Sequence, residues 1–96
     1  MGASDFMVRS NGSTAREAFQ AAVEDAEYEY GHGGYSGTIA EKDSFKEIPV
    51  PKDVDPVEFA NSLMDDEDDR ISDKWGPAGC VKIEDGKYLF FGWASS

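Results

Sequence analysis

Apolar residues recur at intervals of three and four between positions 14 and 30, and this spacing predicts one amphipathic helix. Thr14 and Glu17 form a Thr-x-x-Glu capping box at its start. Gly31 directly follows the last apolar position and is typical of a helix end. The stripe that should face the core consists of Ala15, Ala18, Phe19, Ala22, Val23, Ala26 and Tyr30.

A second helix is predicted to begin at Pro56, with Asp55 as its N-cap. Its apolar stripe consists of Val57, Ala60, Leu63 and Met64. An acidic run follows and should end the helix, because negative charges at a helix C-terminus oppose its dipole. The run consists of Asp65, Asp66, Glu67, Asp68 and Asp69.

Short alternating segments predict strands at residues 6–9, 35–41 and 45–50, the last confined to an edge by Pro49. Residues 80–93 are predicted to form a hairpin, because Asp85-Gly86 is a strong signal for a two-residue turn. In this register Glu84 pairs with Lys87.

The predicted hairpin has two apolar faces. One consists of Val81, Ile83, Tyr88 and Phe90 and should pack under the helices. The other carries Cys80, Leu89, Phe91 and Trp93. These apolar side chains must be covered by another part of the chain or by a partner. A second copy of the chain, in a homodimer, is one such partner. The expected fold is α+β, in the order β-α-β-β-α-β-β: an antiparallel sheet of four to five strands with two helices packed on one face. We expect a single acidic domain over residues 1–96.

The net charge of the chain limits the classes of partner that it is expected to bind. The 96 residues contain 9 Lys and Arg against 20 Asp and Glu, for a net charge of -11. Nucleic acids and anionic membranes need cationic side chains to bind them, so direct binding to either is not expected. A basic protein surface would be attracted instead. No apolar run reaches the roughly 20 residues of a membrane span, and the lone cysteine suits a reducing cytoplasm.

No metal, cofactor or catalytic group is expected. A calcium loop starting at Asp65 fails where Arg70 and Gly76 stand in place of its glycine and its glutamate. His32 is the only histidine and Cys80 the only cysteine, and nothing local pairs them as a nucleophile and its base. The expected function is therefore non-enzymatic binding.

Acidic side chains are the predicted contacts with a basic protein. Helical spacing places Glu17, Glu24 and Glu27 away from the apolar stripe, together with Tyr28. The acidic run after the second helix, Asp65 to Asp69, is the other candidate surface. Two alternatives remain at this point: a neighbouring segment covers Tyr28, and the acidic run is only solvated.

A second hypothesis is a small-ligand site that sequesters a nucleotide signal. The aromatic residues near the glycine-rich segment suit stacking on a flat base. The candidate ligand-binding residues are His32, Tyr35, Trp75 and Trp93. A packing role for these aromatics is the alternative, and the negative charge of the chain disfavours phosphate.

Three segments resemble small acidic proteins of bacteriophages and mobile elements: residues 29–42, residues 72–80 and the segment Phe-Phe-Gly-Trp-Ala-Ser at residues 90–95. The resemblance implies a counter-defence inhibitor, similar in role to an anti-CRISPR protein. Such an inhibitor would act in the host cytoplasm as a DNA mimic. It would occupy a basic protein surface that otherwise holds nucleic acid. A structural or assembly protein of the particle is a further alternative.

Overall fold

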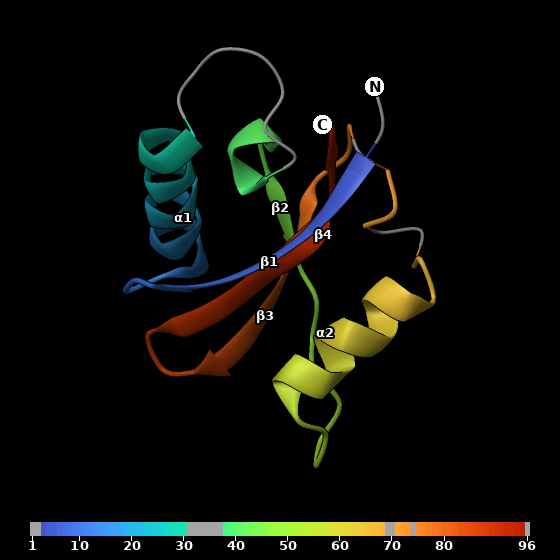
Figure 1. Ribbon diagram of the computed structural model, residues 1–96. Coiled ribbons are helices and arrows are strands. Elements are labelled where there is room, and N and C mark those ends of the chain that lie inside the picture. The colour runs from blue at the N-terminus through green and yellow to red at the C-terminus, as the bar shows by residue number, and fades with distance from the viewer. Residues whose placement is uncertain (1–2, 31–37, 69–70, 74, 96) are drawn as a thin grey trace.

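The computed structural model describes residues 3–30, 38–68, 71–73 and 75–95. Four strands form one sheet in the order β1-β4-β3-β2, and the two helices lie on either side of it (Figure 1). The elements are β1 (Ala3–Asn11), α1 (Ala15–Tyr30), the short 3-10 helix η1 (Ile39–Glu41), β2 (Phe45–Glu47), α2 (Pro56–Asp65), β3 (Ala78–Glu84) and β4 (Lys87–Ser95). The α+β class and the four strands confirm the prediction.

Both helices begin where their capping signals predicted. The Thr14 hydroxyl accepts a hydrogen bond from the N–H of Glu17 at 3.2 Å, and the Glu17 carboxylate accepts one from the N–H of Ser13 at 2.9 Å. At α2, the Asp55 carboxylate accepts from the N–H of Val57 at 2.9 Å. These contacts satisfy N–H groups that have no partner within the helix, so the local sequence is sufficient to start both helices.

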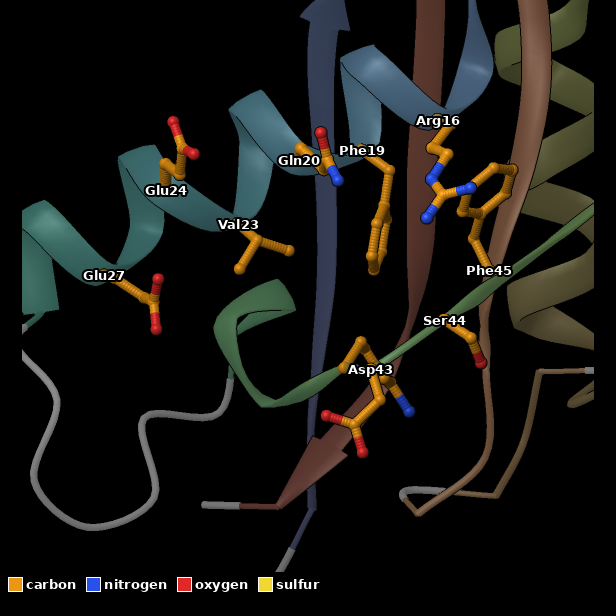
Figure 2. Close-up of a pocket in the computed structure, with 10 residues that line it drawn as sticks. Arg16, Phe19, Gln20, Val23, Glu24, Glu27, Asp43, Ser44 and Phe45 are labelled. Carbon is orange, nitrogen blue, oxygen red and sulfur yellow. The ribbon is translucent and has the colours of Figure 1, made fainter.

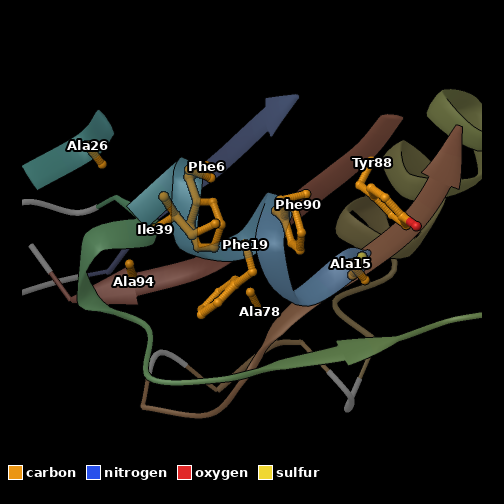
Figure 3. Packing of buried hydrophobic residues seen from close by; sticks show 12 residues of the cluster. Phe6, Ala15, Phe19, Ala26, Ile39, Ala78, Tyr88, Phe90 and Ala94 are labelled. Carbon is orange, nitrogen blue, oxygen red and sulfur yellow. The ribbon is translucent and has the colours of Figure 1, made fainter. Parts of the chain in front are cut away.

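Each helix covers a different face of the sheet, which corrects the prediction that both pack on one face. On the α1 side, Phe19 packs in a cluster with Phe90 of β4 (Figure 3). On the α2 side, Leu63 packs in a second cluster with Leu89 and Phe91 of the same strand. Successive side chains of a strand point to opposite faces. Because neighbouring residues of β4 are apolar on both faces, each face needs its own helix.

The hairpin face that required cover is only partly as predicted: Leu89 and Phe91 are buried within the chain and Trp93 is half-buried, whereas Cys80 lies on the α1 side, which corrects its grouping with them. Leu89 is 1% exposed and Phe91 is fully buried beneath α2. These two residues cannot serve as the homodimer surface considered from the sequence.

The strand at the β2 edge also differs from the prediction. β2 pairs with β3 in parallel, so the sheet is mixed. The predicted strand at residues 35–41 lies partly outside the described residues, and its last three residues form η1, where the Thr38 hydroxyl accepts from the N–H of Ala40 at 3.2 Å. α2 lies between β2 and β3 in the chain, which is the long crossover that a parallel pair requires.

A bulge shifts the predicted hairpin register. Glu84 pairs with Lys87 as predicted, but Tyr88 pairs with Lys82 and Leu89 with Val81, so Ile83 is an extra residue. A one-residue shift moves a side chain to the other face. Val81 and Ile83 consequently belong to the α2 side, and the predicted grouping of both with Tyr88 and Phe90 is wrong.

None of the helices in the described part of the chain has the length and apolar character needed to cross a membrane.

Candidate partner-binding site

A groove runs between α1 and the segment that leads into β2 (Figure 2). It has a volume of about 730 Å³. Its lining consists of Arg16, Phe19, Gln20, Val23, Glu24, Glu27, Lys42, Asp43, Ser44 and Phe45. We call this the α1 groove. It includes Glu24 and Glu27, two of the predicted contact residues.

The floor of the α1 groove is apolar and firmly packed. The rings of Phe19 and Phe45 lie 5.0 Å apart between centroids, and each lies within 5.7 Å of the fully buried ring of Phe90. Tilted and edge-on ring pairs at such distances are favourable. Phe19 is only 7% exposed, so the accessible part of this fixed apolar floor lies mainly at the half-buried Val23 and Phe45, where the aliphatic stem of a lysine or arginine can pack.

The accessible charges around the floor are mainly negative. Glu24 and Asp43 are exposed and Glu27 is half-buried. Arg16 is the only exposed cation among the lining residues, because Lys42 is buried at 4% exposure. The rim can thus pair with cationic groups above an apolar floor.

Lys42 links the lining of the α1 groove to the loop that precedes β3 through two hydrogen bonds. Its Nζ donates to the carbonyl oxygens of Asp73 at 3.2 Å and of Gly76 at 2.9 Å. Burial lowers the pKa of Lys42 from its ordinary value, and the nearby Asp73 carboxylate partly opposes this effect. The ammonium group therefore has a structural role in joining two loops.

The other predicted α1 contacts, Glu17 and Tyr28, lie in different surroundings. Glu17 is exposed in the first turn, where it accepts the hydrogen bond from Ser13 described above. Tyr28 is 94% exposed. That exposure excludes the alternative in which a neighbouring segment covers Tyr28, and its ring is available to a partner.

The acidic run lies at the far end of α2. Asp65, Asp66 and Glu67 are exposed and Asp68 is half-buried, whereas Asp69 lies outside the described residues. The carbonyl oxygen of Asp68 accepts hydrogen bonds from the N–H groups of Ile71 and Ser72, both at 2.9 Å. Because α1 and α2 cover opposite faces, the structure does not bring the two predicted acidic surfaces together (Figure 1).

The residues of the nucleotide hypothesis are described only in part. Trp75 is 65% exposed on the loop before β3. Trp93 is half-buried in β4, and its indole N–H is shielded from solvent without a hydrogen-bond partner in the described chain. Neither lines the α1 groove. His32 and Tyr35 lie outside the described residues.

Cys80 is fully buried in the α1-side cluster. Burial, with a smaller contribution from the charge of Glu47, raises the pKa of its thiol to about 12. The thiol is therefore protonated at neutral pH, and a protonated, buried thiol is a poor nucleophile. Among the described residues, no three His, Cys, Asp or Glu side chains are grouped so that they could hold a metal ion.

Sequence reasoning missed the second wall of the α1 groove. Residues 42–44 read only as a turn, and Phe45 only as the start of a strand. Nothing local indicates that this segment lies against α1, because the contact between Phe19 and Phe45 joins residues 26 positions apart in the chain. An apolar Phe45 between the polar Ser44 and Lys46 was the one available signal.

No protein family, curated protein or solved structure matches the chain. Function is therefore inferred from the geometry and charge of the surface itself.

Proposed function

We propose that this protein is a non-enzymatic binding protein that engages a basic surface of another protein through the α1 groove. One observation carries the proposal: the carboxylates of Glu24, Glu27 and Asp43 surround an apolar floor on a chain whose net charge is -11. Lysine and arginine side chains complement both the apolar floor and the surrounding carboxylates, because their stems are apolar and their ends are cationic.

Charge and apolar contact contribute differently to such a complex. The overall negative charge accelerates encounter with a basic partner, and this effect weakens with salt. Exposed ion pairs each contribute little to affinity, typically below about 1 kcal/mol. A large aromatic side chain is a more effective anchor. Tyr28 is exposed one turn beyond Glu24 on α1 and would supply it.

A further part of the proposal names the kind of partner, and it extends the expectation, drawn from the sequence, that the chain is similar to small acidic phage proteins. A basic surface that normally holds nucleic acid is the kind of partner that this charge pattern fits. By occupying that surface in the host cytoplasm, the protein would act as a counter-defence inhibitor.

The proposal is tested with a panel of basic nucleic-acid-binding proteins, measured between about 50 and 200 mM salt. We expect the dissociation constant of the double variant Glu24→Lys/Glu27→Lys to be about tenfold higher than that of the wild type. Asp65→Lys/Asp66→Lys is the matched control, since it makes the same change in charge on the opposite side of the sheet.

Each outcome has a clear meaning. Loss of binding in the α1 variant alone, together with salt dependence, supports the α1 groove. Binding that is indifferent to salt and to the α1 substitutions contradicts the proposal. If only the control variant loses binding, the contact surface is the acidic run at the end of α2 and the α1 groove is not the site.

A further inference from the structure

β1 forms a long open edge of the sheet. It pairs with β4 over nine residues, Ala3–Asn11, and no other strand in the described chain pairs with its outer side. The opposite edge is formed by β2, which has three residues. An open edge presents unpaired N–H and C=O groups, and a second extended chain can add to it.

The hydrogen-bond alternation of an antiparallel ladder indicates which groups are open. The N–H of Gly12, just after β1, donates to the carbonyl oxygen of Gly86 in the hairpin turn at 3.1 Å. Backbone groups two residues apart point to the same side. Counting back from Gly12 in steps of two, the even-numbered residues of β1 bond to β4. The backbone groups of Asp5, Met7 and Arg9 therefore face the open edge.

A groove follows this edge beneath the second half of α1. It has a volume of about 560 Å³ and is lined by residues 4–9 of β1, with Ala22, Asp25, Ala26 and Glu29 of α1 and Thr38 and Ile39 beside η1. We call it the edge groove. Phe6 and Val8 supply an apolar wall. Asp25 and Glu29 are exposed on the helix above them.

We propose that the edge groove binds an extended basic segment of a partner protein, which adds to β1 as a fifth strand. The basic character of the partner rests on the function proposed above, whereas the surface is separate from the α1 groove. Alternate side chains of the added strand point towards α1. Lysine or arginine at those positions packs its stem on Phe6 and Val8 and directs its charge to Asp25 or Glu29.

Charge favours this occupant over a second copy of the chain. Pairing of two β1 edges would bring together two molecules that each carry a net charge of -11. The exposed carboxylates of Asp25 and Glu29 line the groove in each copy, and Arg9 is the only cation in its lining. Like charges at close range oppose association, whereas a cationic strand is attracted.

The probe is a blocked peptide of alternating lysine and threonine, about eight residues long to match the strand. It is titrated into isotopically labelled protein of residues 1–96 at low salt and followed by amide NMR and hydrogen exchange. We expect the amide protons of Met7 and Arg9 to exchange about tenfold more slowly with saturating peptide. A peptide of alternating glutamate and threonine should not protect them.

Two variants test the backbone and the charge contributions separately. Met7→Pro removes one outward N–H, a change that edge strands tolerate, and should raise the dissociation constant about tenfold. Val8→Pro is its control, since it removes a bond to β4 and should unfold the sheet. Asp25→Lys/Glu29→Lys alters only exposed side chains, and it decides the question if Met7→Pro fails to fold.

Four results measured at the edge groove itself would overturn the edge proposal. Two concern the peptides: the amide exchange rates of Met7 and Arg9 stay unchanged with millimolar basic peptide, or the acidic peptide binds as tightly as the basic one. The third is that the Asp25→Lys/Glu29→Lys variant binds the basic peptide with wild-type affinity. The fourth is that the amides of Met7 and Arg9 become protected as protein concentration rises, without peptide. The last result would identify a second copy as the occupant. Peptide-induced shifts confined to the α1 groove would refute edge binding and leave the proposed function intact. Suppose instead that the peptide protects the edge but Glu24→Lys/Glu27→Lys leaves partner binding unchanged. That result would support edge binding and contradict the proposed function of the α1 groove.

Discussion

The backbone N–H of Asp68 donates to the carbonyl oxygen of Leu63 at 3.1 Å and closes the C-terminal turn of α2. A second bond joins the N–H of Glu67 to the carbonyl oxygen of Met64 at 3.1 Å. This pair of bonds is a Schellman motif, and the residue within it, Glu67, has a φ of 50°. Glycine is favoured at such a position, because a side chain in the left-handed region costs about 1–2 kcal/mol.

We therefore predict that Glu67→Gly raises the free energy of unfolding by about 1 kcal/mol relative to Glu67→Ala. Both variants remove the same negative charge at the end of α2, so their difference isolates the backbone conformation. Urea denaturation followed by circular dichroism measures it. Equal stability of the two variants would show that Glu67 is not strained in solution.

Burial of Cys80 should protect its thiol from reagents. Because the side chain is fully buried and its pKa is about 12, we expect alkylation by iodoacetamide at neutral pH only through opening of the fold. The rate should approach that of a free thiol once the protein is unfolded in urea. Fast alkylation of the native protein, followed by mass spectrometry, would contradict the buried position.

The same shift predicts a loss of stability in alkali. The folded-state pKa of Cys80, about 12, lies above its ordinary value of 9.0. The unfolded chain therefore releases this proton first, and the contribution of Cys80 to stability is complete below pH 9.0 and declines towards pH 12. Cys80→Ala lacks this contribution. The difference in unfolding free energy between wild type and variant, measured across that range, should fall as pH rises.

The contribution of Lys42 to stability should change with pH in the direction opposite to that of Cys80. Its folded-state pKa is lowered from 10.5, so the unfolded chain retains this proton at a higher pH than the folded chain does. Its contribution to stability therefore rises with pH below 10.5. At neutral pH, Lys42→Met leaves two carbonyl oxygens without their donor and should lower the free energy of unfolding by about 1–3 kcal/mol.

The exposed Lys46 of β2 provides the control for Lys42. Lys46→Met makes the same chemical change at the surface and should alter stability by less than about 0.5 kcal/mol. The pH series is measured for wild type and both variants by urea denaturation. A wild-type pH dependence that Lys42→Met leaves unaltered would assign the effect to other groups.

Gly79 of β3 is required for close packing on the α2 side of the sheet. A Cβ at this position would lie 2.7 Å from Cγ2 of Ile71 and 2.7 Å from the ring of Phe91, both buried. We predict that Gly79→Ala lowers the free energy of unfolding by about 1–3 kcal/mol through overpacking. Gly76→Ala is the control, because its nearest neighbour is Asp73 Cβ at 3.2 Å. Thermal denaturation that ranks the two variants equally would exclude tight packing at Gly79.

Both helices and the position of the hairpin turn could be predicted from neighbouring residues. The hydroxyl of Thr14 and the carboxylate of Asp55 bond to N–H groups two or three positions further on, so they start α1 and α2 wherever these helices pack. Asp85-Gly86 specifies a turn in the same local way, and Gly86 has the positive φ, 80°, that the turn requires. The period of α1 likewise predicted that Glu24 and Glu27 lie outside the core.

Contacts between distant segments decided the remaining features. The bulge at Ile83 changes which face each residue of β3 occupies, and apolar residues on both faces of β4 leave two possible sides for each helix. The α1 groove depends on Phe45 meeting Phe19, and the edge groove depends on β1 taking the outer place in the sheet. Local hydrogen bonds and side-chain periodicity contain no information on such pairings, because these follow from the free energy of burying apolar surface across the whole chain.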